Sequence, residues 1–346
     1  MIILLILLFL VSLYGMKFSS FHEDYISLDA TNAIKGVFAV IILYSHMRQY
    51  LFLSDTFVNN SYIEVLKYLG QMMVTMYLFY SGYGLMESLK QKPNYRKHFL
   101  KNRFLKILLH FDIAVLMYII LQMILGKQYL MSEYLESLVG WTSVGNSNWF
   151  IFDILVLYLF FYLSMCLADR YGRKFNIHLG SVVLIISLLF SVLLWFFLHH
   201  IKGQSWWFDN ILAFPLGIWY SLYRSKIETW LRNSWRYYIT FFILTITLVV
   251  WRHFKGVDIW GVCTCLFALW VVLLSIKVKF DNKILQWLGV QAFAIYILQR
   301  LPMIAFSSMG INHNTPLFVT IVIISVFLIA YIYTKFLKNI DKRLFV

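Results

Sequence analysis

Apolar runs of about twenty residues recur from one end of this chain to the other, and short polar segments separate them. A helix needs a run of that length to cross the hydrocarbon core of a bilayer. The pattern therefore predicts an all-α, polytopic transmembrane helix bundle with about 10–11 spans. The expected spans are 1–14, 33–52, 67–88, 104–125, 149–168, 179–199, 206–223, 237–252, 257–276, 284–305 and 316–337.

The pattern contains no linker or repeat that would divide the chain, and no soluble domain fits between the spans. We expect one integral-membrane domain over residues 1–346, with its core at 28–337 and an extra N-terminal span at 1–15. A cleaved signal peptide begins with basic residues, whereas here Lys17 follows the first apolar run. We therefore interpret this run as a short span.

Lys and Arg are distributed so that alternate segments between the spans are basic. Cytoplasmic segments of membrane proteins carry this excess of positive charge. The predicted cytoplasmic segments are 15–32, 90–106, 169–174, 224–236, 277–283 and the tail 335–343. The predicted outer segments are 53–66, 126–148, 200–205, 253–256 and 306–315. This alternation predicts a cytoplasmic C-terminus.

The composition supports the membrane assignment, because 61% of residues are hydrophobic and only 13% are charged. Soluble domains carry roughly 25% charged residues. The formal net charge of +14 lies in the short segments between spans, so we attribute it to topology and contact with lipid, with no nucleic acid as partner. Cys166, Cys263 and Cys265 all lie in apolar runs, and we expect neither a disulfide framework nor a metal site.

Lys35 and His46 lie eleven residues apart inside one apolar run. In an α-helix this spacing puts both side chains on one face, about 16 Å apart along the axis. A cation and an imidazole are costly in hydrocarbon and indicate a functional site that faces the bundle interior. We predict that Lys35 lies near the cytoplasmic mouth and that His46, deeper in the bundle, is a general base. The alternatives are a lysine that extends to the membrane surface and a hydrogen-bonded interfacial histidine.

The basic segment 90–106 ends where the next span begins, and Arg103 and Lys106 lie on one side of that helix. Cations at this height can bind the phosphates of a cytoplasmic donor, Arg with two parallel hydrogen bonds and Lys as a point charge. The alternative is an anchor that contacts anionic lipid.

Several other polar residues inside apolar runs are secondary candidates. Asp153, four residues after Trp149, is expected to pair with a cation or to orient a hydroxyl. Asp112 is a candidate intramembrane partner near His110, and Arg300 lies where an unpaired cation would be costly.

Two further local features concern helix geometry. The segment 77–85 contains small residues, including Ser81, that permit close helix contact, so packing is the alternative to a functional role there. Pro215 and Pro302 fall inside or near expected spans, where proline can kink a helix.

These features together resemble the membrane-bound acyltransferase 3 family. Its first conserved helix carries an arginine, ten intervening residues and a histidine; here Lys35 and His46 occupy those positions. The segment 80–84 resembles the family's Phe/Ser/Gly segment, and Arg103 with Lys106 resembles its Arg-x-x-Arg pattern. The start of a middle span at Asn148, Trp149 and Phe150 is similar to the family's as well. The late helix at 288–299 resembles one that often ends in His, but Gln299 stands there and cannot titrate.

The resemblance covers residues 28 to 337. It implies transfer of an acyl group, usually acetyl, from cytoplasmic acyl-CoA to a hydroxyl of an extracytoplasmic glycan, in a bacterial cytoplasmic membrane. Acetyl-CoA would be the donor substrate, bound by Lys35, Arg103 and Lys106, with His46 as the base. The supporting residues would be Ser81, Trp149, Asp153, Gln299 and Arg300.

Two other functions remain open from the sequence. A transporter or flippase for a glycan or lipid-linked saccharide would use similar aromatic spans and interior polar residues. A sensory or structural membrane module would explain the apolar runs but not the Lys35–His46 pair.

Overall fold

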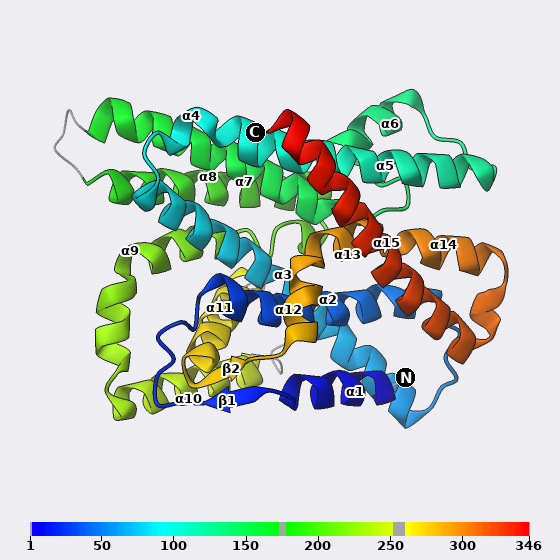
Figure 1. Cartoon of the computed structure of the whole chain (residues 1–346), viewed down its shortest axis with the longest axis horizontal. Coiled ribbons are helices and arrows are strands. Elements are labelled where there is room, and N and C mark those ends of the chain that lie inside the picture. Colours follow the sequence, from blue (N-terminus) through cyan, green and yellow to red (C-terminus); the bar gives the residue numbers. More distant parts are fainter. Residues whose placement is uncertain (1, 173–177, 252–259, 346) are drawn as a thin grey trace.

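The computed structural model describes residues 2–172, 178–251 and 260–345, and these form an almost entirely helical bundle (Figure 1). Its α-helices are α1 (Ile2–Leu13), α2 (Leu28–Met47), α3 (Phe57–Gln91), α4 (Tyr95–Phe99), α5 (Lys106–Ile124), α6 (Met131–Leu138), α7 (Trp149–Leu167), α8 (Leu179–Lys202), α9 (Ala213–Leu231), α10 (Ser234–Trp251), α11 (Trp260–Lys277), α12 (Lys283–Val290), α13 (Ala292–Leu298), α14 (Arg300–Ser308) and α15 (Thr315–Leu344). Single turns and strands complete the described chain: η1 (Arg48–Tyr50), η2 (Leu100–Leu105), η3 (Ala168–Gly172), η4 (Ser205–Trp207), η5 (Ile311–His313), β1 (Met16–Phe18) and β2 (Val278–Phe280).

Six described helices are long and apolar enough to cross a membrane, and a bent pair raises the number to seven if it is counted as one span. The predicted all-α membrane class is therefore confirmed. The expected number of about 10–11 spans is not reached by this criterion within the described residues. The other expected spans are helical too, but α1 and α11 are shorter, and α3 and α9 do not meet the criterion of length and apolarity. The expected outer segment 253–256 and residues 173–174 of an expected cytoplasmic segment lie outside the described residues.

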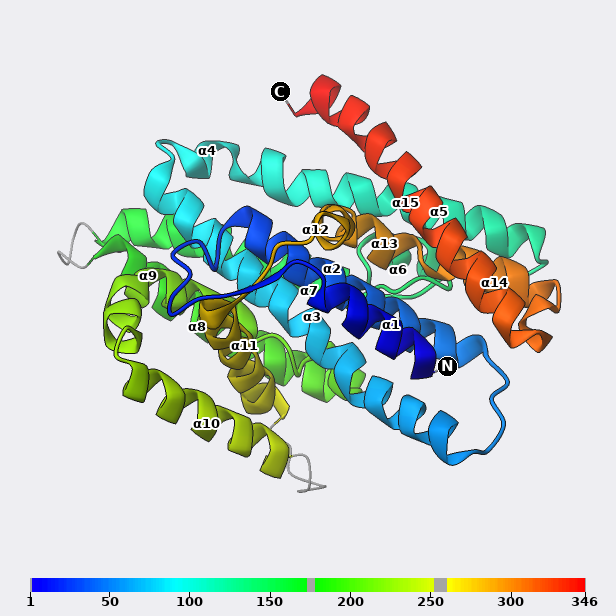
Figure 2. The same cartoon turned by 60° about the horizontal axis from the view of Figure 1, so that its bottom comes forward.

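Helix α2 runs through the middle of the bundle, whereas α10 lies at its edge in both views (Figures 1 and 2). The most apolar stretch of α2 is 72% buried, whereas that of α10 is 11% buried. The helix begins at Leu28 because the Ser27 side chain accepts a hydrogen bond from the Ala30 backbone N–H, and Asp29 favours the positive end of the helix dipole. The two polar residues predicted to mark a site, Lys35 and His46, thus belong to the central helix.

Glycines allow α2 to touch α12 backbone to backbone. A Cβ atom on Gly36 would come within 2.0 Å of the Leu285 carbonyl oxygen, and one on Gly289 within 1.8 Å of the Asn32 carbonyl oxygen. Both distances are far below a van der Waals contact, so any side chain at either position would force the helices apart. Small residues serve this purpose in membrane bundles.

A second crossing of the same kind joins α3 to α9. A Cβ atom on Gly82 would meet the Phe214 carbonyl oxygen at 2.0 Å, and one on Gly217 would meet the Phe79 carbonyl oxygen at 2.1 Å. Gly82 belongs to the small-residue segment 77–85, so close helix contact explains that part of the segment.

The expected span 284–305 is broken into two parts: α12, and α13 followed by α14. The axis of α12 makes an angle of 57° with that of the second part. The bend lies between Val290 and Ala292 and not at Pro302, and a second interruption separates α13 from α14 at Gln299. Pro302 and Pro215 are each the third residue of their helix, α14 and α9. A proline in the first turn removes no intrahelical hydrogen bond, so both helices accommodate it.

A short antiparallel pairing of β1 with β2 joins two segments that the charge pattern placed on the same side of the membrane. Between the same two segments, Lys279 binds Asp24 at 2.5 Å, and this hydrogen bond lowers the pKa of the Asp24 carboxyl. Arg96 binds Asp169 at 2.5 Å, linking two further predicted cytoplasmic segments. The described segments that were predicted to share a side therefore contact one another; that this side is cytoplasmic stays a prediction.

Substituting Gly82 by Ala should lower the melting temperature, with a loss of about 1–3 kcal/mol of folding free energy, because the new methyl group overlaps the α9 backbone. Gly84→Ala is the matched control in the same helix, since a Cβ there meets nothing within 4 Å. Alanine favours helix over glycine by roughly 0.5–1 kcal/mol, so the control should be neutral or stabilising. Thermal unfolding in detergent measures both, and equal melting temperatures would contradict the packing described here.

Candidate active site

A cavity of about 740 Å³ lies between α2, α3, α5, α7, α12 and α13. We call it the central cavity. Its mouth is formed near helix ends by Leu28, Ser88 and Asn102, and its inner end contains Tyr77 and Tyr296. Since α3 rises about 1.5 Å per residue, Tyr77 lies roughly 16 Å deeper than Ser88. The cavity therefore leads from the predicted cytoplasmic side into the interior of the bundle.

Three predicted cations line this cavity: Lys35 from α2, Arg103 from η2 and Lys106 at the start of α5. No carboxylate within the described ranges forms an ion pair with Lys35 or Arg103. Both cations are thus free to bind an anionic ligand. The structure thus brings Lys35 to the same cavity as Arg103 and Lys106, which lie about seventy residues later in the sequence. These are the three residues predicted to bind donor phosphates.

The third cation, Lys106, forms an ion pair with an acidic residue that we did not predict as part of the site. Asp341 of α15 binds Lys106 at 2.7 Å and the His110 Nε2 atom at 2.8 Å. His110 thus pairs with Asp341 and not with its near neighbour Asp112. A signal existed, because Asp341 is the one acidic residue in the basic tail 335–343. Any phosphate at Lys106 would compete with Asp341 for the ammonium group.

Tyrosines and phenylalanines form much of the cavity wall beyond these cations. The Phe150 and Tyr296 rings lie 5.3 Å apart between centroids, and Tyr77 lies 6.2 Å from Phe150. The predicted residue Ser81 is also in the wall, where the Tyr158 hydroxyl donates to its Oγ at 3.4 Å. Such a wall suits the apolar arm of a long ligand whose anionic end remains at the mouth.

His46 does not line the central cavity; Tyr296 of α13 lies between them. The Tyr296 ring is part of the cavity wall and also lies 6.5 Å from the His46 ring, edge to face. Because α2 is helical from Leu28 to Met47, the eleven-residue spacing puts Lys35 and His46 on one side of it. Lys35 lines the cavity, whereas His46 packs against the Tyr296 ring that forms part of the cavity wall.

The direct partner of His46 is Arg300. Its Nε and Nη2 atoms lie 3.3 Å and 3.2 Å from the His46 Nδ1 atom, and Nη2 also donates to Gln49 Oε1 at 2.6 Å. A guanidinium can only donate, so Nδ1 accepts, and a neutral His46 ring carries its hydrogen on Nε2. The interior cation predicted at Arg300 is therefore held by neutral partners. In this arrangement the basic nitrogen of His46 is occupied.

Three buried residues near this point have polar atoms without a hydrogen-bond partner among the described residues: both carboxyl oxygens of Asp153, the Tyr296 hydroxyl and Gln299 Oε1. Asp153 and Gln299 have no exposed surface, and Asp153 is close enough to Tyr296 to interact with it electrostatically. Asp153 does not pair with a cation, contrary to one of the two roles expected for it. Unpaired buried polar atoms require an explanation such as a catalytic role or a bound water or ion, although others occur elsewhere in the described residues, for example in Tyr62 and Ser191.

The remaining predicted residues have more limited roles. Gln299 donates from Nε2 to the Tyr296 carbonyl at 3.2 Å, which fixes the end of α13 beside Tyr296. Trp149 begins α7, where its ring contacts Phe150 at 6.2 Å, but it does not line the cavity. No group of three or more His, Cys, Asp or Glu side chains that could hold a metal occurs among the described residues.

The fold and this site define a helical membrane protein with a cation-lined cavity entered from one face and an arginine-bound histidine beyond its inner end. A family model described as an acyltransferase domain matches residues 27–335. The chain therefore belongs to the acyltransferase 3 family and is a membrane acyltransferase. The match begins after α1, and membership favours the enzyme over the transporter or flippase. Comparisons with curated proteins and with solved structures returned no match.

Asp153→Asn should leave the melting temperature unchanged or raise it, because it removes an ionisable group that has no partner in the described structure. Asp341→Asn is the matched control, and it should lower folding stability by about 1–3 kcal/mol because it weakens two pairs at once. Thermal unfolding of both variants tests this contrast. A larger loss in Asp153→Asn would mean that its carboxyl is bound by groups of the protein itself.

Proposed function

We propose that this protein transfers an acyl group, acetyl in the simplest case, from acyl-CoA on the cytoplasmic side to a hydroxyl of a cell-envelope or exported polysaccharide. The supporting observation is the arrangement of groups from several elements: Lys35 and Arg103 line a deep cavity without an ion-pair partner within the described residues, Tyr296 of α13 lies at its inner end, and the His46 ring packs against Tyr296. The proposed location is a bacterial cytoplasmic membrane with the C-terminus inside.

The donor would enter the central cavity with its phosphates at the mouth. Lys35 and Arg103 would bind them, and Lys106 would contribute in competition with Asp341. The phosphate-bearing end would stay near water, which lowers the cost of burying its charge. The narrow apolar arm would extend along the aromatic wall and bring the thioester toward Tyr296.

The acceptor would approach from the opposite side, where Arg300 and Gln49 lie beside His46. Its hydroxyl would replace Arg300 at Nδ1 of His46, since that nitrogen is the one without hydrogen. As the hydroxyl oxygen attacks the thioester carbonyl carbon, its proton passes to Nδ1. The carbon–sulfur bond breaks, the thiolate leaves, and the proton on His46 passes to that sulfur to give free CoA and an ester.

Two residues would control access to this step. Tyr296 separates the cavity from His46 and has to move aside or lie along the thioester before the two substrates meet. Arg300 occupies Nδ1 until an acceptor displaces it. An occupied base cannot activate water, which would protect the thioester from hydrolysis.

The first test is binding and turnover of acetyl-CoA by purified protein in nanodiscs, with His46→Ala as the principal variant. Binding should be saturable in both proteins, whereas transfer should be lost in the variant while expression and folding are retained. Full activity of His46→Ala would end the proposal for this residue. No binding and no turnover by folded wild-type protein would refute acyl-CoA as the donor.

A second pair of variants tests the donor mouth. Lys35→Arg should retain more acetyl-CoA affinity than Lys35→Ala, because arginine keeps the charge and can bind phosphate with two hydrogen bonds. Losing one charge-assisted contact corresponds to about a tenfold weaker affinity. Lys97→Gln, an exposed cation outside the cavity, is the matched control. Equal losses in both Lys35 variants would argue against a phosphate contact.

Arg300→Gln should separate transfer from hydrolysis. Removing the guanidinium frees Nδ1, so acceptor-independent hydrolysis of acetyl-CoA should rise while transfer to the acceptor falls. Arg48→Gln is the control, because Arg48 is a neighbouring cation whose side chain forms no hydrogen bond with the His46 ring within the described residues. Release of CoA thiol with and without acceptor measures both reactions, and an unchanged ratio in Arg300→Gln would contradict the blocking role.

A further inference from the structure

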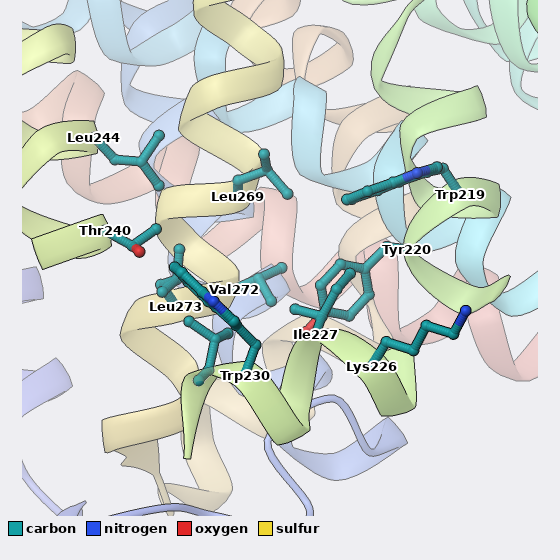
Figure 3. A pocket seen from close by; sticks show the side chains of 11 residues that line it. Trp219, Tyr220, Lys226, Ile227, Trp230, Thr240, Leu244, Leu269, Val272 and Leu273 are labelled. Carbon is teal, nitrogen blue, oxygen red and sulfur yellow. The ribbon is translucent and has the colours of Figure 1, made fainter. Parts of the chain in front are cut away.

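A second cavity, of about 400 Å³, lies on the outside of the bundle between α9, α10 and α11. We call it the α9–α11 groove. In Figure 3, Trp219 and Tyr220 of α9 lie on one side, Thr240 and Leu244 of α10 lie on the other, and α11 contributes residues between them. The α11 residues are Leu269, Val272 and Leu273. The lining is almost wholly apolar, and the size is that of a small-molecule pocket.

A third cavity, also of about 400 Å³, adjoins this groove and shares Lys226 and Trp230 with it. Its other lining residues carry hydroxyl groups or a charge: Ser225, Thr229 and Arg236. Lys226 and Arg236 are exposed, and neither forms an ion pair within the described residues. The apolar groove thus adjoins a space with two cations; the Lys226 ammonium group lies 5.9 Å from the centroid of the Tyr223 ring, and neither cation has an ion-pair partner within the described residues.

The order of these spaces matches the depth of the membrane. Lys226 and Arg236 belong to the predicted cytoplasmic segment 224–236, at the end of α9 and the start of α10. From there Thr240 and Leu244 lead progressively along α10 into the membrane. The polar cavity is therefore at the height of lipid headgroups and the apolar groove at the height of acyl chains.

We propose that the α9–α11 groove and its polar mouth bind one anionic glycerophospholipid of the cytoplasmic leaflet. An acyl chain would fill the groove, and the phosphate would contact Lys226 and Arg236. A soluble anion would leave the groove unused. A second copy of this chain is a poorer occupant, because its own segment 224–236 would bring the same positive charge to the cations.

This lipid would complete the packing of α10. That helix packs against α11, its most apolar stretch is only 11% buried, and the groove separates it from part of α9. A bound chain would fill this space and hold α10 in place. The site is separate from the central cavity, because no residue lines both.

The test is photolabelling in nanodiscs with phosphatidylglycerol that carries a diazirine on its acyl chain, followed by peptide mapping. Labels should appear on α10 and α11 near Leu244 and Leu269, and unlabelled phosphatidylglycerol should compete better than phosphatidylcholine. Lys226→Gln with Arg236→Gln should reduce the labelling at least about tenfold, because each cation contributes to binding of anionic lipid.

The control variant is Lys92→Gln with Lys97→Gln, which removes the same charge from exposed residues of another predicted cytoplasmic segment. It should leave the labelling unchanged. Equal competition by the two lipids, or an equal loss in both double variants, would overturn a specific site in favour of general attraction to an anionic membrane.

A third variant, Leu269→Trp, fills the groove and leaves both cations in place. It should also abolish labelling of α10 and α11, while the melting temperature in lipid-free detergent stays close to that of wild type. Unchanged labelling would overturn the proposed path of the acyl chain. A dimer in native mass spectrometry that this variant disrupts, without a change in labelling, would assign the groove to a second copy and overturn the lipid.

Discussion

The crossing of α2 with α12 is the contact on which the rest of the site depends. Asn32, Gly36, Leu285 and Gly289 bring two backbones to a separation at which no side chain fits. This contact holds Lys35 of α2 opposite the break that follows α12, and Gly289 itself lines the central cavity. The helix then bends by 57° and continues as α13, which places Tyr296 against His46. A wider crossing would open the cavity wall and separate those two rings.

The charged residues inside the bundle differ in whether they have a partner of opposite charge. Near the mouth of the central cavity, Asp341 forms an ion pair with Lys106 and accepts a hydrogen bond from His110. One acid thus binds two groups. Deeper in the bundle, Arg300 has only neutral partners, His46 and Gln49, and Asp153 has none among the described residues. An uncompensated polar group in such a place destabilises the fold by about 1–3 kcal/mol. Asp153, beside the proposed site, is one of the residues that carry this cost.

Much of this architecture could be predicted from the sequence. Periodicity gave the helices, the distribution of Lys and Arg grouped the segments that contact one another, and the eleven-residue spacing put Lys35 and His46 on one side of α2. The failures have physical causes. A hydrophobic run of twenty residues does not reveal a bend, so the break near Gln291 was not predicted; the expected kink concerned the prolines, Pro215 and Pro302. Partners distant in sequence, such as Asp341 for Lys106 and Arg300 for His46, follow from packing and leave no local pattern.

The two helices of the central crossing, α2 and α12, lie far apart in the sequence, and this separation limits how early the site can assemble. Strand β1 precedes α2 and strand β2 precedes α12. The ion pair between Asp24 and Lys279 beside these strands joins residues that are 255 positions apart in the sequence. During synthesis α2 therefore enters the membrane long before the helix that crosses it exists. Its lysine and histidine have to be accommodated by lipid, water or other helices for most of translation. Helix α2 is among the first to insert, yet its environment is completed among the last.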